Sequence, residues 1–201
     1  MAKIKLTRGE LKKQRDALRQ YQRYLPTLQL KKQQLQMEIL KLLSSLGQVR
    51  AQEAEKKAAC LAWSGLLATE GIEVALWMKP VSEITSSRNI AGVEVMLLER
   101  LEFAAAEYDL FSMPLWLDRG LELLREEKSL RLQMLRLDQA VETLRHELRI
   151  TTQRVNLFEK VKIPEAEEAI RVIKISIGDQ MANAVGRSKA AKRKIEALSE
   201  A

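Results

Sequence analysis

The chain has 201 residues and a formal net charge of +7; 30% of its residues are charged and only 4% are aromatic. One cysteine, Cys60, and one histidine, His146, exclude an internal disulfide framework and a zinc site built from these residue types. The commonest residues, Leu, Lys, Arg, Glu, Gln and Ala, are strong helix formers, which indicates long helices rather than a compact globule.

Charge is unevenly distributed along the chain. Residues 1–60 hold 14 Lys or Arg against 5 Asp or Glu, residues 61–120 hold 4 against 9, and residues 121–201 hold 16 against 13. A basic balance can indicate nucleic-acid binding, but no aromatic-interleaved basic patch or zinc-finger spacing accompanies it here. We therefore interpret the basic ends as solvated helix surface and keep nucleic-acid binding as the alternative.

The first long helix is predicted over residues 1–70. Thr7 followed by Glu10 is a capping-box pattern, which is typical of a helix N-terminus. Apolar residues then recur at alternating spacings of three and four, the pattern of a left-handed coiled-coil seam. The predicted seam residues of this helix are Leu28, Leu35, Ile39, Leu42, Leu46 and Val49.

Two features disturb this first seam. Pro26 follows the lead-in residues Leu11, Leu18 and Leu25, and predicts a kink or a short break. Polar residues also stand at three seam positions: Lys32, Glu53 and Lys56. Either their stems cover apolar surface while the charged heads reach water, or a third chain covers the seam there, and the sequence leaves both interpretations open.

Residues 71–120 differ from the rest of the chain, since Pro80, Gly92, Pro114 and Gly120 punctuate them. Val81–Ser86 and Val93–Glu99 have partial alternation and β-branched residues, so we expect a small β-hairpin or loop-rich knob at the far end of the helix pair. Five aromatic residues gather in this acidic segment, as a local core or as a docking face. They are Trp77, Phe103, Tyr108, Phe111 and Trp116.

The second long helix is predicted over residues 121–201, with a seam that alternates by four and three. Its seam residues are Leu130, Met134, Leu137, Val141, Leu144, Leu148, Val155 and Phe158. Pro164 lies where the apolar stripe changes phase, because the stripe of Ile163, Ala166, Ile170 and Ile173 is displaced from the earlier one. We therefore expect a bend near Pro164 that re-aims the stripe.

These patterns predict an all-α fold: a long antiparallel two-helix coiled coil of the N- and C-terminal helices, with a small central β-hairpin or loop knob. About 60 residues per helix at 1.5 Å rise would make a rod on the order of 90 Å long. Narrow apolar stripes of this kind need a partner helix for stability.

The groups that an enzyme needs are missing from the sequence. His146 falls between seam positions and is expected to be solvated, and Cys60 on the first seam is expected to be a buried, unreactive packing thiol. No phosphate-binding glycine motif occurs, and carboxylate pairs such as Glu126-Glu127 lie on polar helix faces. We expect no catalytic residue, no cofactor and no metal, and a mechanical or binding role.

Three segments together resemble one known family. Thr152-Gln153-Arg154-Val155-Asn156-Leu157-Phe158-Glu159 followed by Ile163-Pro164 looks like the C-terminal signature of the D subunit of the V-type (V/A-type) rotary ATPases. Arg88–Val95 is similar to the family's middle segment, and Leu28–Ile39 to its first helix. The signature residues are Asn89, Gly92, Val93, Arg154, Val155, Asn156, Glu159, Ile163 and Pro164. Gln153 and Phe158 depart from the pattern, which has an arginine and a smaller residue there.

The resemblance implies a non-catalytic central rotor shaft that couples ATP hydrolysis or synthesis to proton or sodium transport. The implied partners are the catalytic and regulatory nucleotide-binding ring subunits (A and B), the small F subunit of the stalk, and the socket subunit (C/d-type) of the membrane rotor. Seven basic residues are expected ring contacts: Arg8, Lys12, Lys13, Arg187, Lys189, Lys192 and Arg193.

We expect the chain at the cytoplasmic face of a membrane as part of the ATPase complex, without nucleic acid. Its start has no apolar h-region, so no secretory signal is expected. No run of about 18 apolar residues occurs, so we expect no direct membrane insertion. The alternative from another class of protein is a coiled-coil adaptor with a basic, nucleic-acid-binding end.

Overall fold

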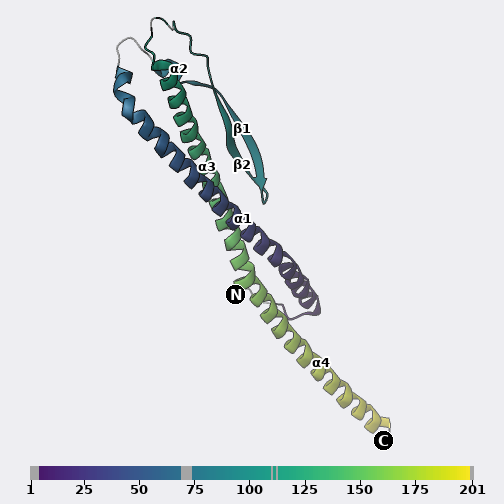
Figure 1. The fold of residues 1–201 in the computed structure, drawn as a ribbon. Coiled ribbons are helices and arrows are strands. Elements are labelled where there is room, and N and C mark those ends of the chain that lie inside the picture. Colours follow the sequence, from purple (N-terminus) through teal and green to yellow (C-terminus); the bar gives the residue numbers. More distant parts are fainter. Residues whose placement is uncertain (1–4, 69–73, 110, 112, 200–201) are drawn as a thin grey trace. The chain divides into compact units, whose positions relative to one another are not determined.

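The computed structural model describes residues 5–68, 74–109, 111 and 113–199. Its elements in chain order are α1 (Arg8–Trp63), η1 (Ser64–Ala68), α2 (Val74–Trp77), β1 (Pro80–Ile90), β2 (Val93–Phe103), α3 (Leu117–Leu157), η2 (Phe158–Lys162) and α4 (Ile163–Ser199) (Figure 1). The predicted fold class is confirmed: long helices from the two ends of the chain pack together, and a two-stranded antiparallel hairpin lies between them in sequence. The domain boundary predicted near residue 71 lies outside the described residues.

The chain divides into two compact units, which are described separately. The hairpin unit is Lys31–Ile150 and contains the hairpin with the helix segments that pack on it. The terminal unit joins Met1–Leu30 to Thr151–Ala201. Helices α1 and α3 each pass from one unit to the other without a break in the helix.

The first helix begins where the capping pattern predicts. The backbone N–H of Glu10 donates to the Thr7 hydroxyl at 3.3 Å, so Thr7 satisfies one of the free amides of the first turn. From there α1 continues through Pro26 to Trp63 as a single helix, without the short break that the proline could have produced. Its covered positions alternate by three and four along the whole helix, from Leu11 to Cys60.

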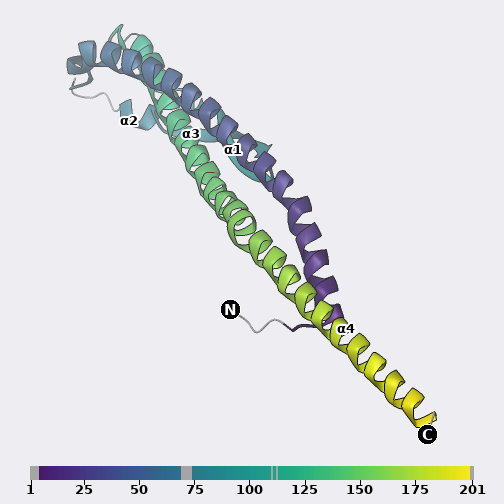
Figure 2. The ribbon, with the colours of Figure 1, turned by 90° about the horizontal axis from the view of Figure 1, so that it is seen from below.

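In the hairpin unit α1 and α3 run antiparallel, side by side (Figure 2). Leu35 and Leu144 are both fully buried between them, at 0% exposure. The remaining buried seam residues of this core are Ile39, Leu42, Leu46, Val49, Leu137, Ala140 and Val141. A buried aliphatic side chain contributes roughly 1.5–3 kcal/mol, so this seam is the main source of stability of the unit.

The two strands of the hairpin are longer than the sequence predicted and pair in antiparallel register from Pro80↔Phe103 to Ile90↔Val93. A two-residue turn joins them, with positive φ at Ala91 (51°) and Gly92 (82°). Positive φ at both positions defines a type I′ turn, whose twist matches that of the strands. The side-chain oxygen of Asn89 accepts a hydrogen bond from the Gly92 amide at 3.0 Å and closes the turn.

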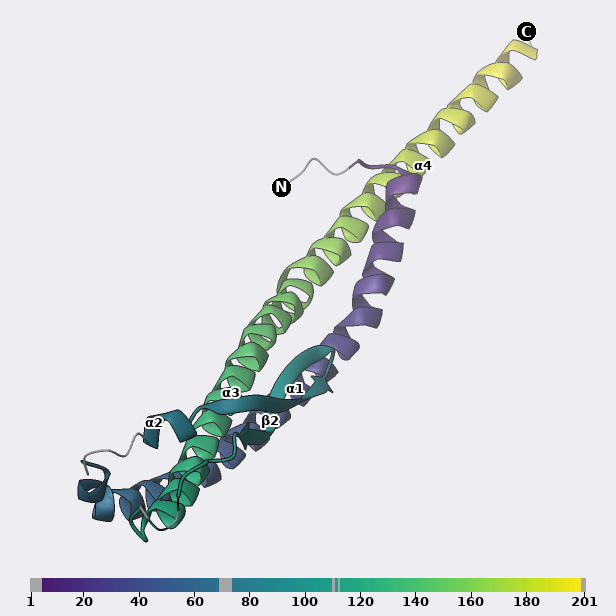
Figure 3. The same ribbon diagram turned by 90° about the horizontal axis from the view of Figure 1, so that it is seen from above.

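The hairpin does not stand at the far end of the helix pair as a separate knob. Ile90 and Val95, at 6% and 2% exposure, belong to the same buried core as Leu35 and Leu144. The turn end of the hairpin therefore folds back along α1 and α3, as Figure 3 shows. The sequence did not reveal this, because a short amphipathic hairpin can pack against any apolar stripe within reach.

The terminal unit contains the start of α1, the end of α3, η2 and α4. Its buried residues are Thr151, Val155, Ala166, Ala169, Ile170 and Ile173. The rings of Tyr21 in α1 and Phe158 in η2 are 5.3 Å apart between centroids, so the two ends of the chain are in contact here. Beyond Gly178 every α4 residue whose burial the structure describes is exposed, and no other described element lies beside this part of the helix (Figures 2 and 3).

Pro164 is preceded by a π turn. The amide of Ile163 donates to the carbonyl of Phe158, five residues earlier, where a regular α-helix bonds to the fourth. Backbone angles stay in the right-handed helical region at both ends, with φ −62° at Leu157 and −67° at Ile163. The helix therefore continues through Pro164 with one additional residue in its turn.

Candidate functional site

The predicted seam residues fall into two groups in the structure. In the hairpin unit they meet in one core, with Leu130, Met134 and Leu148 partly buried at its margin. In the terminal unit Val155 is buried at 3% exposure, while Phe158 and Leu28 are half-buried. The apolar seam is a packing surface, so a function must come from what lies around it.

Ion pairs cross from α1 to α3 beside the seam. Lys31 Nζ lies 2.8 Å from Glu147 Oε1, and Lys56 Nζ lies 2.6 Å from Glu126 Oε2. The residue numbers rise on α1 as they fall on α3, as an antiparallel pair requires. Surface ion pairs contribute between about 0 and 1 kcal/mol each, so they select register more than they add stability.

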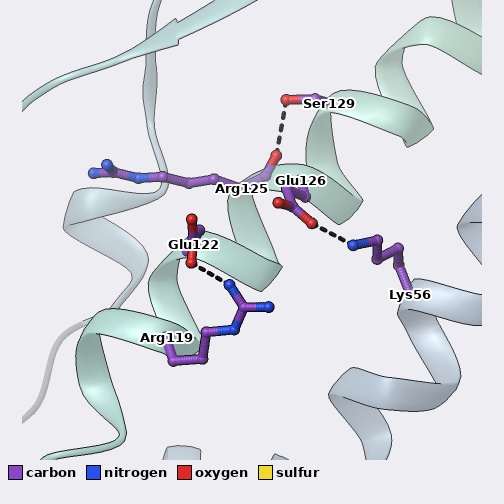
Figure 4. A network of polar contacts seen from close by, with 6 residues as sticks. All are labelled: Lys56, Arg119, Glu122, Arg125, Glu126 and Ser129. Atoms are coloured by element: carbon purple, nitrogen blue, oxygen red, sulfur yellow. Dashed lines mark hydrogen bonds and ion pairs between the residues drawn. The ribbon is translucent and has the colours of Figure 1, made fainter.

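Of the three polar residues at seam positions, Lys56 keeps its charged end in contact with water. Its side chain is 38% exposed and ends at Glu126, while Lys32 and Glu53 are half-buried. In Figure 4 the Lys56 side chain reaches from α1 to Glu126 of α3. The same view shows the Arg119–Glu122 ion pair along α3 and the Ser129 hydroxyl donating to the carbonyl of Arg125.

Arg125 of α3 holds both ends of the hairpin. Its Nη2 donates to the carbonyls of Trp77 at 3.0 Å and Ala104 at 2.8 Å, directly before β1 and directly after β2. The guanidinium carbon lies 5.2 Å from the centre of the Phe103 ring, a cation–π contact. Lys128, one turn later, donates to the Met78 carbonyl.

Sequence reasoning missed Arg125 and Lys128 as anchors. On a charged helix they look like ordinary solvated residues, and their acceptors are backbone carbonyls, which have no sequence signature. The ion pair of Arg136 with Glu83, at 2.6 Å, adds a third link between α3 and the hairpin. These contacts fix the hairpin on α3 at its open end, whereas the buried core fixes its turn.

The aromatic residues of the acidic segment form separate pairs. Trp77 stacks at a tilt on Tyr108, with centroids 5.1 Å apart, and Trp116 lies 6.1 Å from Trp63 of α1. A β-carbon at Gly120 would lie 3.1 Å from the Trp116 ring, so this position on α3 has no room for a side chain. Phe111, in contrast, is fully exposed. The segment thus combines small local cores with one uncovered aromatic ring.

An open groove of about 880 Å³ lies between α1 and α3 near these aromatic residues. Its charged lining is mostly acidic and comes from both helices: Glu55, Lys56, Asp118, Glu122, Arg125 and Glu126. Both cations are already engaged, Lys56 by Glu126 and Arg125 by backbone carbonyls. The groove is therefore acidic in character and has no free cation among these lining residues to bind an anionic ligand.

The residues of the family signature mark two structural irregularities. Asn89, Gly92 and Val93 build the type I′ turn of the hairpin and its first strand pair. The others stand on either side of the π turn: Arg154, Val155, Asn156, Glu159, Ile163 and Pro164. Only Val155 of this second set is buried, so most of the set faces solvent in the isolated chain.

All seven basic residues predicted as ring contacts belong to the terminal unit and are exposed. Arg8, Lys12 and Lys13 lie in the first turns of α1, and the other four lie in the uncovered part of α4. Lys192 pairs at 3.5 Å with Glu196 one turn later, with 77% of its side chain exposed. These two groups form the basic surface of the unit.

The described residues offer little chemistry. Burial raises the pKa of the Cys60 thiol, with a smaller contribution from Glu127, so the thiol stays protonated at neutral pH. A hydrogen bond with Asp118 raises the pKa of the Tyr108 hydroxyl. Over the described part of the chain, no three His, Cys, Asp or Glu side chains gather as a metal site would require, and no helix is long and apolar enough to cross a bilayer.

Comparison with known proteins decides the family. The sequence profile of the ATP synthase D subunit matches residues 10–193. The chain belongs to the family of ATP synthase D subunits. A relative from Borreliella burgdorferi, described as the D subunit of a V-type ATP synthase, is 41% identical over 192 residues, covering 96% of this chain and 95% of the relative.

Two further relatives with the same description come from Chlamydia trachomatis and Chlamydia muridarum. They are 32% and 34% identical over 199 and 203 residues, and each alignment covers 97% of both chains. The match to the D subunit thus extends through α1, the hairpin, α3 and α4. An ATP synthase subunit of this family is a component of a multisubunit complex, so the uncovered surfaces described above are candidates for contacts with other subunits.

Proposed function

We propose that this chain is the central rotor shaft of a V/A-type ATPase, a non-catalytic part that couples ATP hydrolysis or synthesis to proton or sodium transport. The observation that carries the proposal is the full-length likeness to relatives described as D subunits of V-type ATP synthases, with 95% or more of both chains aligned for the three relatives above. The antiparallel pairing of α1 and α3 supports a mechanical role, because two packed helices resist twisting better than one helix.

In this role the shaft would act by contact alone. As it turns inside the ring of nucleotide-binding A and B subunits, its uneven surface would favour a different conformation at each catalytic interface. A conformational equilibrium shifts only where the contacts differ between its states, so the identity of the contacting face matters more than the strength of binding. The chemistry of ATP would belong to the ring.

The basic surface of the terminal unit is the proposed contact with the ring. Seven exposed cations on α1 and α4 would meet acidic lining, and complementary charge of this kind sets orientation and association rate more than affinity. The hairpin unit would meet the small F subunit of the stalk and the socket subunit (C/d-type) of the membrane rotor. The complex would then hold this chain at the cytoplasmic face of the membrane without inserting it.

Reconstitution with the A and B subunits tests the proposal. The purified chain should have no ATPase activity and should stimulate the ring. A variant with Arg187, Lys189, Lys192 and Arg193 changed to Gln should bind the ring more weakly and lower the coupled ATPase rate. The matched control changes four exposed cations of the hairpin unit to Gln, namely Lys57, Lys79, Arg131 and Arg149, and should retain ring binding.

Unchanged assembly and turnover with the first variant would contradict the ring contact, and failure of the parent chain to bind the ring would contradict the shaft role itself. The basic end of α4 also motivates the second candidate, a nucleic-acid-binding adaptor. Steeply salt-dependent binding of DNA or RNA by the parent, lost in the α4 variant, would favour that candidate.

A further inference from the structure

We propose that the π turn Phe158–Lys162 is a one-residue phase shift built into the second long helix, and that it determines which face α4 presents along its uncovered length. Residues of the terminal unit alone carry the inference about phase. Its consequence for the partner rests on the proposed function.

The first observation is the displacement of the buried stripe. Thr151 and Val155 are buried near the end of α3. Continued at alternating spacings of three and four, they would place the covered face at positions 158, 162, 165, 169 and 172. Glu165 is instead exposed, and the covered residues are Ala166, Ile170 and Ile173, each one position later.

The second observation is the hydrogen bond of the turn. Because the Ile163 amide bonds to the carbonyl of Phe158 and skips the nearer one, this turn holds one residue more than an α-helical turn. One extra residue rotates everything that follows by about 100°. That rotation equals the displacement of the stripe, so the backbone and the pattern of burial record the same insertion independently.

Pro164 explains why the insertion stays where it is. A proline lacks the amide that would bond to the carbonyl four residues earlier, on Lys160, and its ring crowds that carbonyl. Glu159, Lys160 and Val161 are all exposed, so backbone groups freed by the irregular turn can bond to water. The one place in the unit where the helix must be irregular is thus also the place where irregularity is least costly.

The shift is transmitted to the part of α4 that nothing covers. α4 is a single helix from Ile163 to Ser199, so its phase after the turn is fixed to the end. At about 100° per residue, the face of Ile170 and Ile173 continues through Met181, Ala184, Ser188, Ala191 and Ile195. Arg187, Lys189, Arg193 and Lys194 lie on the opposite half of the helix.

Met181 and Ile195 are 49% and 67% exposed, and they are the apolar side chains on the continued face. Under the proposed function, that face and the basic face are presented to different parts of the ring. Without the extra residue, both faces would point about 100° away from their present directions. The π turn is therefore a positioning element for the partner surface, although no partner needs to touch it.

Single-residue deletions in the full-length chain test the inference. Deleting Val161 removes the extra residue and turns Ala166, Ile170 and Ile173 out of the covered face. The midpoint of thermal unfolding should fall by about 10 °C, and amide protection in residues 163–177 should fall at least tenfold. Deleting Asn183, in the uncovered part of the same helix, is the matched control and should change neither quantity.

A rescue variant decides the case if the first deletion fails to fold. Deleting Val161 and inserting one alanine between Pro164 and Glu165 restores the residue count, and should restore both the unfolding midpoint and the protection. Failure of this rescue, or a Val161 deletion as stable as the parent with the same protected residues, would overturn the phase inference.

The readouts of the isolated chain do not depend on the ring, so they separate this inference from the proposed function. The Asn183 deletion tests the consequence for the partner, because it rotates Ala184–Ser199 without disturbing packed residues. It should weaken ring stimulation at least tenfold if the parent stimulates the ring, and full stimulation by the folded deletion variant would overturn that consequence.

Discussion

Two prolines lie inside the long helices of this chain, and they affect the phase of the buried stripe differently. At Pro26 the covered positions continue from Leu25 to Leu28 and Lys32 without a change of spacing, in a helix that runs unbroken from Arg8 to Trp63. At Pro164 a π turn precedes the proline and the stripe moves by one residue. A proline in a helix therefore need not change the phase, and the apolar pattern on either side indicates whether it does.

The surroundings of Pro26 account for part of the difference. Pro26 is exposed, and the hydroxyl of the next residue, Thr27, donates to the Tyr24 carbonyl at 2.7 Å, one turn back on the helix. A side-chain donor thus replaces some of the backbone bonding that the proline removes near this point. At Pro164 the backbone itself changes its hydrogen bonding.

The largest expected effect comes from forcing Pro26 to behave as Pro164 does. Insertion of one alanine between Pro26 and Thr27 rotates Leu11, Leu18 and Leu25 by about 100° relative to the seam that follows. The loss of several packed leucines should lower the free energy of unfolding by at least about 4 kcal/mol, measured by urea denaturation. Equal stability would mean that α1 tolerates an added residue as the other helix does, and the comparison would fail.

The two prolines should also differ when each is replaced by alanine. Pro26→Ala should raise the free energy of unfolding by about 1–3 kcal/mol, because proline is strongly unfavourable inside an otherwise regular helix. Pro164→Ala should change it by less than about 1 kcal/mol, because its position at the second residue of α4 follows a turn that is already irregular. Chemical denaturation of both variants beside the parent measures the difference, and a larger gain at Pro164 would contradict the account given for the π turn.

Glycines extend the comparison from the prolines to the covered and uncovered parts of the helices. A β-carbon at Gly47 of α1 or Gly186 of α4 would contact nothing within 4 Å. Gly47→Ala should stabilise the chain by about 1 kcal/mol through helix propensity. Gly186→Ala should leave the unfolding midpoint unchanged, because that part of α4 packs on nothing described, and should only slow local amide exchange. A global gain from Gly186→Ala would show that the end of α4 unfolds together with the rest.

Sequence patterns predicted the features that repeat and those that depend on one residue type. The heptad spacing located the residues of the core, from Leu35 to Leu144, and the displaced stripe after Pro164 indicated a change of phase there. The spacing alone did not show whether a bend, a break or an extra residue absorbed the change. That choice depends on backbone hydrogen bonds, which are not encoded in a repeat.

Contacts to backbone carbonyls and between distant elements were beyond the sequence. Arg125 and Lys128 anchor the hairpin through the carbonyls of Trp77, Ala104 and Met78, and any residue type offers a carbonyl. Ala91 adopts a positive φ that favours glycine or asparagine, so composition gave no indication of the two-residue turn at that position. The folding of the hairpin onto the seam likewise required the three-dimensional structure.

The smallest expected effect concerns an ion pair on α4 in the turns that follow Pro164. Arg171 donates to both carboxylate oxygens of Glu168, at 2.6 and 2.8 Å, and these hydrogen bonds lower the pKa of Glu168. Because the pKa in the folded chain lies below that in the unfolded chain, the pair stabilises the fold fully above the unfolded pKa. The contribution is lost as the pH falls through the folded pKa.

An NMR titration of the Glu168 carboxyl carbon measures this pKa directly. Arg171→Gln should raise it, and Arg145→Gln, which removes an equally exposed arginine of the other pair Arg145–Glu142, should leave it unchanged. The effect on unfolding should be slight in both variants, since exposed pairs are screened by water and salt. A Glu168 pKa that stays low in Arg171→Gln would show that the charge distribution around the start of α4, and not the local pair, favours the ionised carboxylate.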